Sequence, residues 1–171
     1  MSDNRTEPFT TMLVDGTVPE LSMASADAGQ TVLPGLLVYK SGTAPDPEVT
    51  VCGTSYGSSF EDESTIYMVE IPASHPSFPK AYDKSVAFTA LTDVFSIHRI
   101  SIGDRMWLKT SGTPSLNETD NVTTYTGGLV TQKASTTIDV WNAHTFRIIG
   151  VWGTASWVIG EYIGRTSQDA S

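Results

Sequence analysis

Histidine, cysteine and acidic side chains are the residues with which this chain could bind a metal or transform a substrate, and they are scattered along it. The three histidines, His75, His98 and His144, share no HxH or HxxH spacing that would direct two imidazoles to one ion. No G-x-S-x-G motif presents a nucleophilic serine. We therefore interpret the histidines as structural or surface residues, and we predict neither a metal site nor a catalytic constellation.

The acidic residues and the single cysteine give no stronger signal. Glu61, Asp62 and Glu63 form the densest acidic cluster, but they lack the spaced ligands of an EF-hand, so a solvated loop is the better interpretation. No pair among the 19 acidic residues can be singled out for glycoside hydrolysis. Cys52 lies in the strand-like segment VTVCGTS and is expected to be a small buried residue rather than a nucleophile. We expect a protein that is not an enzyme and needs no cofactor.

The overall charge narrows the range of partners. The chain has 171 residues, a net charge of −9 and a pI near 4.6, and it has no cluster of Lys and Arg that could neutralise successive phosphates. Nucleic acid is therefore not expected as a partner. No apolar run approaches the length of about 18 residues that spans a membrane, so no membrane association is expected. The first residues lack the pattern of a secretory signal, which predicts synthesis in the cytoplasm.

The elements that must position these residues are short β-strands. Apolar, β-branched segments recur between Gly and Pro turns at spacings of about eight to twelve residues, which is typical of an all-β sandwich or barrel. The expected strands are Val32–Lys40, Val49–Gly53, Ile66–Ile71, Lys84–Leu91, Val94–Ile100, Arg105–Thr110, two fragments within Val122–Gln132, Thr136–Trp141, Phe146–Trp152 and Ala155–Ile163. We predict one β-barrel or β-sandwich domain of about ten short strands over residues 31–165.

Two connections and the two ends complete this prediction. Ser101–Asp104 is expected to be a tight turn, and Asn142–Thr145 to close a hairpin. Residues 1–30 are polar and small apart from the apolar patch Phe9–Val14, and Ser22–Gln30 has no periodicity and is interpreted as loop. The segment 1–30 is therefore predicted to be an extended N-terminal arm, lying on a neighbouring subunit or on its own barrel. Residues 166–171 are a polar tail.

The tryptophans are the most informative aromatic residues. Trp141, Trp152 and Trp157 fall close together among β-rich segments, and in a domain of this size most of them are expected in the core. Two alternatives stay open. Exposed rings could form a platform that stacks on carbohydrate, or they could anchor an oligomer interface.

Three segments carry a resemblance to a known family. They are SIGDRMWLKTS, which is an apolar strand around a Gly-Asp turn, YTGGLVTQ, and the closing segment FRIIGVWGTASWVIGEYIGR. In this order they resemble the small β-barrel decoration (cement) proteins on the capsids of tailed bacterial and archaeal viruses. The resemblance covers Lys80–Arg165, about half of the chain, and the region before Lys80 departs from the pattern.

The resemblance implies a structural virion protein that binds the outside of the capsid shell and stabilises contacts between major capsid subunits. It implies the major capsid protein as partner, a homo-oligomer with a trimer favoured, and a location on the virion surface after synthesis in the host cytoplasm. Interface residues are predicted from the apolar patch of the arm and from one strand. They are Phe9, Met12, Leu13, Val14 and Trp107.

Two other functions are kept open. The first is a carbohydrate- or receptor-binding β module of a viral tail or cell surface, which would use exposed Trp or Tyr rings. The second is an enzyme of unrecognised type, whose sign would be a polar pocket with converging histidines and carboxylates.

Overall fold

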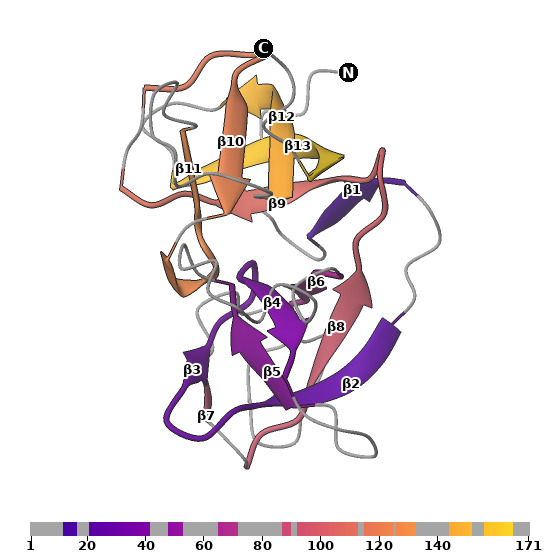
Figure 1. The fold of residues 1–171 in the computed structure, drawn as a ribbon, viewed down its shortest axis with the longest axis vertical. Helices are drawn as coiled ribbons and strands as arrows, with labels where there is room; N and C mark the ends of the chain where they lie inside the picture. The colour runs from indigo at the N-terminus through magenta and orange to yellow at the C-terminus, as the bar shows by residue number, and fades with distance from the viewer. Residues whose placement is uncertain are drawn as a thin grey trace.

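The chain is built from β-strands arranged in two stacked groups. The computed structural model describes residues 12–16, 21–41, 48–52, 65–71, 87–89, 92–112, 115–124, 126–132, 144–151 and 156–165. One group is a closed five-stranded barrel and the other is a six-stranded sheet, and they lie one above the other along the long axis (Figure 1). The predicted all-β class is confirmed.

The first barrel is formed by the first half of the chain. Its strands are β2 (Leu21–Ala26), β4 (Leu37–Lys40), β5 (Glu48–Val51), β6 (Tyr67–Val69) and β8 (Phe95–Arg99), and they close in the order β2-β5-β4-β6-β8. A two-stranded ribbon of β3 (Thr31–Val32) and β7 (Phe88–Thr89) accompanies the barrel. Its interior is filled by small and β-branched side chains and by the stacked rings of Phe88 and Phe95, whose centroids lie 4.7 Å apart.

The second half of the chain, together with the N-terminal strand β1, forms the sheet. In spatial order its strands are β1 (Leu13–Asp15), β9 (Arg105–Lys109), β13 (Trp157–Arg165), β12 (His144–Val151), β10 (Asn121–Thr124) and β11 (Val130–Gln132). A short 3-10 turn, η2 (Thr126–Gly128), separates β10 from β11. The far edge curls back, because Thr110 bridges Val130 in parallel and the Ser111 N–H donates to the Val130 carbonyl at 2.8 Å. Strands β9, β13, β12, β10 and β11 therefore form a second ring, with β1 added at its rim.

The closed barrel, called the first ring from here on, and the second ring have the same strand connectivity. In the first, β2 pairs parallel with β5 and antiparallel with β8, β4 pairs with β5 and β6, and β6 pairs with β8. In the second, β9 meets β11 in parallel through the Thr110 bridge and pairs antiparallel with β13, while β10 pairs with β11 and β12, and β12 with β13. Residues 21–99 and 105–165 thus repeat one five-stranded connectivity.

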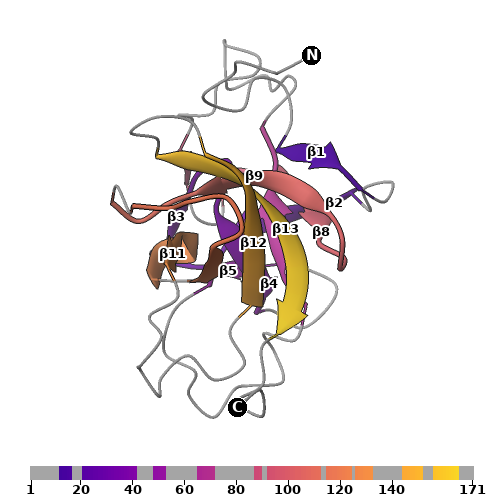
Figure 2. The ribbon, with the colours of Figure 1, turned by 90° about the horizontal axis from the view of Figure 1, so that it is seen from above.

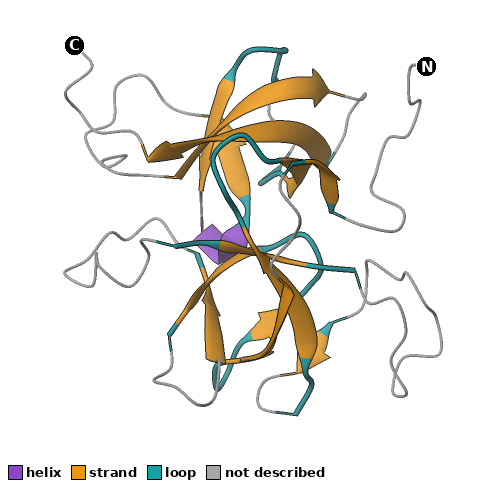
Figure 3. Cartoon of the chain, turned by 90° about the vertical axis from the view of Figure 1, so that its right-hand side faces the viewer, coloured by secondary structure: helices purple, strands orange, loops and turns teal. Residues whose placement is uncertain are grey.

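The two rings share one hydrophobic core. A single buried cluster joins residues of the first ring, such as Leu37 and Met68, to residues of the second, such as Met106, Phe146 and Trp157. Viewed along the long axis, β12 and β13 lie over β4 and β5 (Figure 2). The side view shows η2 at the level where the two sets of strands meet (Figure 3). Because the shared cluster is buried from both sides, the two rings form one body.

Most of the predicted strands are found, with bounds that are shorter or shifted by one or two residues. The turn at Ser101–Asp104 is also present, since the Asp104 N–H donates to the Ser101 carbonyl at 3.0 Å. This turn does not close a hairpin, because β8 belongs to the first ring and β9 to the second. The predicted strand Thr136–Trp141 and the tail 166–171 lie outside the described residues.

Two local predictions were wrong. The segment 22–30, interpreted as loop, contains most of β2, which closes the first barrel between β5 and β8. Its alternation is real, because Ala24 and Ala26 are buried while Met23 is exposed, but alanine carries too little apolar surface to give a clear sequence signal. The expected turn Asn142–Thr145 was also wrong in its last two residues, since β12 already begins at His144. The described part of residues 1–30 therefore packs into the body as β1 and β2.

Candidate interface at the N-terminal strand and the ring junction

The predicted interface residues differ in how exposed their side chains are. Phe9 lies outside the described residues. Met12 and Trp107 are 0% and 4% exposed, so both side chains pack inside their own chain and offer no surface to a second molecule. Leu13 is half-buried and Val14 is 48% exposed, at the outer edge of the sheet. Of the predicted interface residues that the structure describes, only Leu13 and Val14 have side chains that a second molecule could contact.

Met12 sits between the two rings. Its carbonyl accepts the Trp107 N–H of β9 at 2.8 Å, and its own N–H donates to Glu70 Oε1, just after β6, at 2.6 Å. Its side chain lies beside Gly35, because a β-carbon built on Gly35 would be 3.2 Å from Met12 Cε and 2.5 Å from Trp157 Cη2. Only glycine leaves room for this packing. Residue 12 therefore links the first ring to the second through backbone and side chain together.

Glu70 and His98 form a buried acid–imidazole contact behind Met12. His98 Nδ1 lies 3.2 Å from Glu70 Oε2, and the imidazole is 1% exposed. Glu70 Oε1 also accepts the Ile71 N–H at 3.0 Å. Among the described residues neither nitrogen of the His98 imidazole has a well-aligned hydrogen-bond partner, so the carboxylate and the imidazole lie close together without a directed hydrogen bond.

The environment of Glu70 favours its ionised form. Burial alone would raise the pKa of this carboxyl group, but the contact with His98 and the hydrogen bonds from the Met12 and Ile71 N–H groups outweigh it and lower the pKa below the ordinary value of 4.5. The carboxylate is thus held as an anion by the two elements that it connects, β8 and the start of β1.

A second link between the rings lies at η2. The Gly128 N–H donates to the Cys52 carbonyl at 2.7 Å, and the Cys52 N–H donates to the Leu37 carbonyl at 2.9 Å. Gly128 has φ +75° and lies so close to β4 that a β-carbon there would be 2.6 Å from the Leu37 oxygen. Cys52 is buried, as predicted from its strand-like context.

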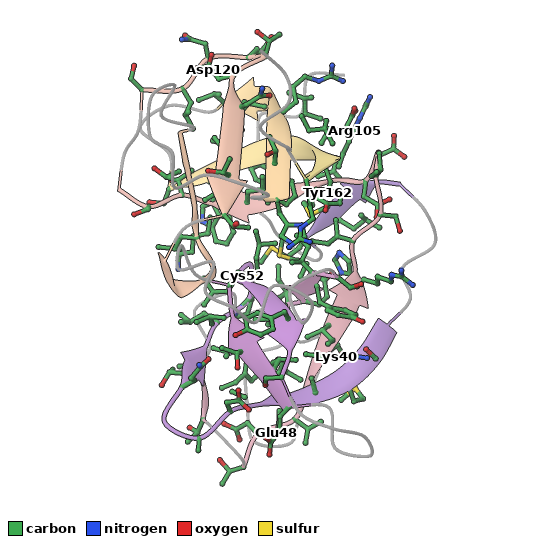
Figure 4. All side chains as sticks on the ribbon, in the orientation of Figure 1. Lys40, Glu48, Cys52, Arg105, Asp120 and Tyr162 are labelled. Atoms are coloured by element: carbon green, nitrogen blue, oxygen red, sulfur yellow. The ribbon has the colours of Figure 1, made fainter. Side chains whose placement is uncertain are left out.

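A buried histidine–tyrosine pair completes the polar groups near the junction. His144 Nδ1 and the Tyr162 hydroxyl lie 2.7 Å apart, and both residues are buried. Burial raises the pKa of Tyr162 above 10.0. Figure 4 shows Tyr162 on the second ring and Cys52 on the first, at the level where the rings meet. The pair satisfies two buried polar side chains, which is a structural role.

The outer face of the second ring carries a network of three charges. Glu161 on β13 accepts from Arg105 Nε at 2.9 Å and from an Arg147 Nη atom at 2.8 Å. The hydrogen bond from Arg105, helped by the charge of Arg147, lowers the pKa of Glu161. The network ties β9, β13 and β12 together on a solvent-exposed face, where such pairs contribute little to stability.

The described residues contain no group of three or more His, Cys, Asp or Glu that could hold a metal ion. His75, the cluster Glu61–Glu63, Trp141 and Trp152 lie outside the described residues. Trp107 and Trp157 are buried, so the indole of neither residue offers a face on which a sugar could stack. Within the described segments no helix is long and apolar enough to cross a membrane.

Sequence reasoning missed the contact between Glu70 and His98. Glu70 stands in the apolar run IYMVEI, and a lone carboxylate in such a run is the signal that could have suggested a buried partner. Its partner, His98, is 28 positions further along the chain, and nothing in the sequence around His98 identifies this residue as the partner.

Comparisons with known proteins leave the chain without an assigned family. No protein-family model matches the sequence, and no curated protein matches it.

Proposed function

We propose that this chain is a structural virion protein that binds the outside of a capsid shell and stabilises contacts between major capsid subunits. The observation that carries the proposal is the position of β1. This strand pairs with β9 and with no other described strand, so it forms an edge of the six-stranded sheet, and its Val14 side chain is half exposed there. A sheet edge can accept a strand from a neighbouring chain through backbone hydrogen bonds.

The body suits a role in covering and clamping. Two rings that share one core give a stiff, elongated unit, and a stiff unit loses little conformational entropy when it bridges two neighbours. Repetition of a modest contact around a shell multiplies its effect, because each further contact of a bound oligomer is intramolecular. The proposed partner is the major capsid protein, the proposed oligomer is a trimer, and the proposed location is the outer surface of the virion.

The experiment compares two surface valines on intact protein. Val14 and Val94 are 48% and 47% exposed, and they lie on the second and the first ring respectively, so they form a matched pair. Val14→Asp places a charge on the proposed contact edge, and Val94→Asp places one elsewhere. Binding is measured by co-sedimentation with expanded capsid shells assembled from the proposed partner, a major capsid protein.

The expected result is that Val14→Asp weakens shell binding by at least about fivefold, as loss of an interface anchor does, while Val94→Asp binds like the unmodified protein. Equal effects of the two substitutions would remove β1 from the contact. Failure of the unmodified protein to bind such shells would overturn the proposed function itself.

A further inference from the structure

We propose that β1 is a releasable strap across the two rings, and that the buried contact between Glu70 and His98 holds it closed. This inference concerns the isolated protein and goes beyond the proposed function. It stands on the geometry around Met12, where one residue contacts both rings through its backbone and its side chain.

The strap is anchored at Met12 and by the backbone pairing of β1 with β9. Met12 is fully buried and makes one backbone hydrogen bond to each ring, to Glu70 and to Trp107. The three residues that follow form β1, in which Leu13 is half-buried while Val14 and Asp15 are exposed. β1 is a three-residue strand at the edge of the sheet with two exposed side chains, and short edge segments of this kind open locally at lower free energy than the core of a protein.

Glu70 supplies the side-chain half of this anchor. Its Oε1 receives the Met12 N–H, and its Oε2 faces the His98 imidazole at 3.2 Å. A hydrogen bond to an ionised acceptor is stronger than one to a neutral acceptor, so the anchor depends on the charge of Glu70. Protonation of the carboxylate removes this charge and weakens the bond to Met12.

The strands packed around Glu70 carry further charged residues. Besides Glu70 and His98, the titratable or charged residues on β1, β6, β8 and β9 are Asp15, Tyr67, Arg99, Arg105 and Lys109, with Asp104 just before β9, and β2 has none. Asp15 and Arg99 are exposed, and Tyr67 packs under the Lys40 amine at 4.9 Å. Asp104 is buried, and its Oδ2 accepts the Ser101 N–H at 2.8 Å.

The sign of the pH dependence follows from Glu70. Its folded pKa lies below the ordinary value of 4.5, so the ionised carboxylate stabilises the closed strap above pH 4.5. This stabilisation is lost as the pH falls through the lowered folded pKa. The strap is therefore expected to open in acid, before the rest of the body unfolds.

A nitroxide label on Val14→Cys tests this directly. Cys52, the single native cysteine, is 1% exposed, so the label attaches to the exposed position 14. Electron paramagnetic resonance then reports the mobility of β1, and far-UV circular dichroism of the same samples reports the β body. At pH 7 the spectrum should be dominated by an immobilised component, and the mobile component should grow as the pH falls below 4.5 through the lowered pKa of Glu70, with the circular dichroism unchanged.

Two carboxylate variants separate the strap from general acid sensitivity. Glu70→Gln keeps the size of the side chain and loses its charge, so the mobile component should already dominate at pH 7 and change little in acid. Asp27→Asn is the matched control: Asp27 also has a lowered pKa in the first ring, but it accepts hydrogen bonds from Ser41 and Thr50 at the other end of β2. This variant should behave like the unmodified protein.

Three results would overturn the proposal. One is an immobilised label in folded Glu70→Gln at pH 7, and another is release in Asp27→Asn as strong as in Glu70→Gln. If Glu70→Gln fails to fold, the acid titration of the otherwise unmodified labelled protein decides. Release of the label before the loss of circular dichroism supports the strap, whereas simultaneous loss of both signals refutes it.

Discussion

The adjacent glycines of η2 offer a sharp test of how the two rings meet. Gly127 and Gly128 both have positive φ, +77° and +75°. An alanine at either position must adopt the left-handed conformation, which costs about 1–2 kcal/mol. The two sites differ in their surroundings, since a β-carbon at Gly127 meets nothing within 4 Å, whereas one at Gly128 would lie 2.6 Å from the Leu37 oxygen and 3.1 Å from the Leu37 nitrogen.

This difference sets the expected magnitudes. The atom nearest to a new methyl group at Gly128 is the Leu37 oxygen, which belongs to the backbone of β4 and cannot move without disturbing the first ring. Such overpacking adds about 1–3 kcal/mol, so Gly128→Ala should lose about 2–5 kcal/mol of unfolding free energy and Gly127→Ala about 1–2 kcal/mol. The two variants share the conformational cost, and the gap between them measures the ring contact alone.

The assay is equilibrium unfolding in urea followed by tryptophan fluorescence, because Trp107 and Trp157 both lie in the core shared by the rings. The slope of the unfolding free energy against urea should stay the same in both variants, so that the midpoint carries the difference. Equal losses for Gly127→Ala and Gly128→Ala would show that η2 does not pack against β4 as described, and the reasoning about the junction would fail.

Two further substitutions test the buried groups around the junction. Met12→Ala should lower the free energy of unfolding by about 2–5 kcal/mol, whereas Val14→Ala, two residues away but exposed, should change it by less than about 0.5 kcal/mol in urea unfolding. Tyr162→Phe should cost about 1–3 kcal/mol because it leaves the buried His144 nitrogen without its partner, which thermal or urea unfolding would detect. Burial raises the pKa of Tyr162, so one of the six tyrosines should ionise above pH 10.0 in an absorbance titration. The stability that the neutral Tyr162 hydroxyl contributes should be lost as the pH rises through this raised folded pKa.

The strands that were predicted correctly are those with bulky alternating side chains. In Arg105–Lys109, Met106 and Leu108 share one face, and both are buried. The Gly-Asp turn before this strand was equally visible, since Gly103 has φ +94° and Asp104 caps the turn by accepting the Ser101 N–H. Period and turn chemistry are local properties, and a sequence displays them directly.

The features that were missed depend on pairings over long distances in the chain. Strand β2 is recognisable only beside β8, where Leu21 pairs with His98. The anchor at Met12 likewise joins residues 58 positions apart, Met12 and Glu70. An apolar patch near an N-terminus fits a free arm as well as a buried plug, and the sequence does not distinguish them because the socket is formed by Gly35 and Trp157, from different rings.

The repeated strand plan explains why the junction is polar as well as apolar. Each ring closes its own backbone pairing, so the rings cannot be joined by a continuous sheet and must meet through side chains and isolated hydrogen bonds. Three such links are present: the Ser101–Asp104 turn, η2 against Cys52, and Met12 between Glu70 and Trp107. The first is the covalent connection between the rings, and the second is built from residues within them. The third comes from outside both rings, and its removal would leave the strand plan of each intact.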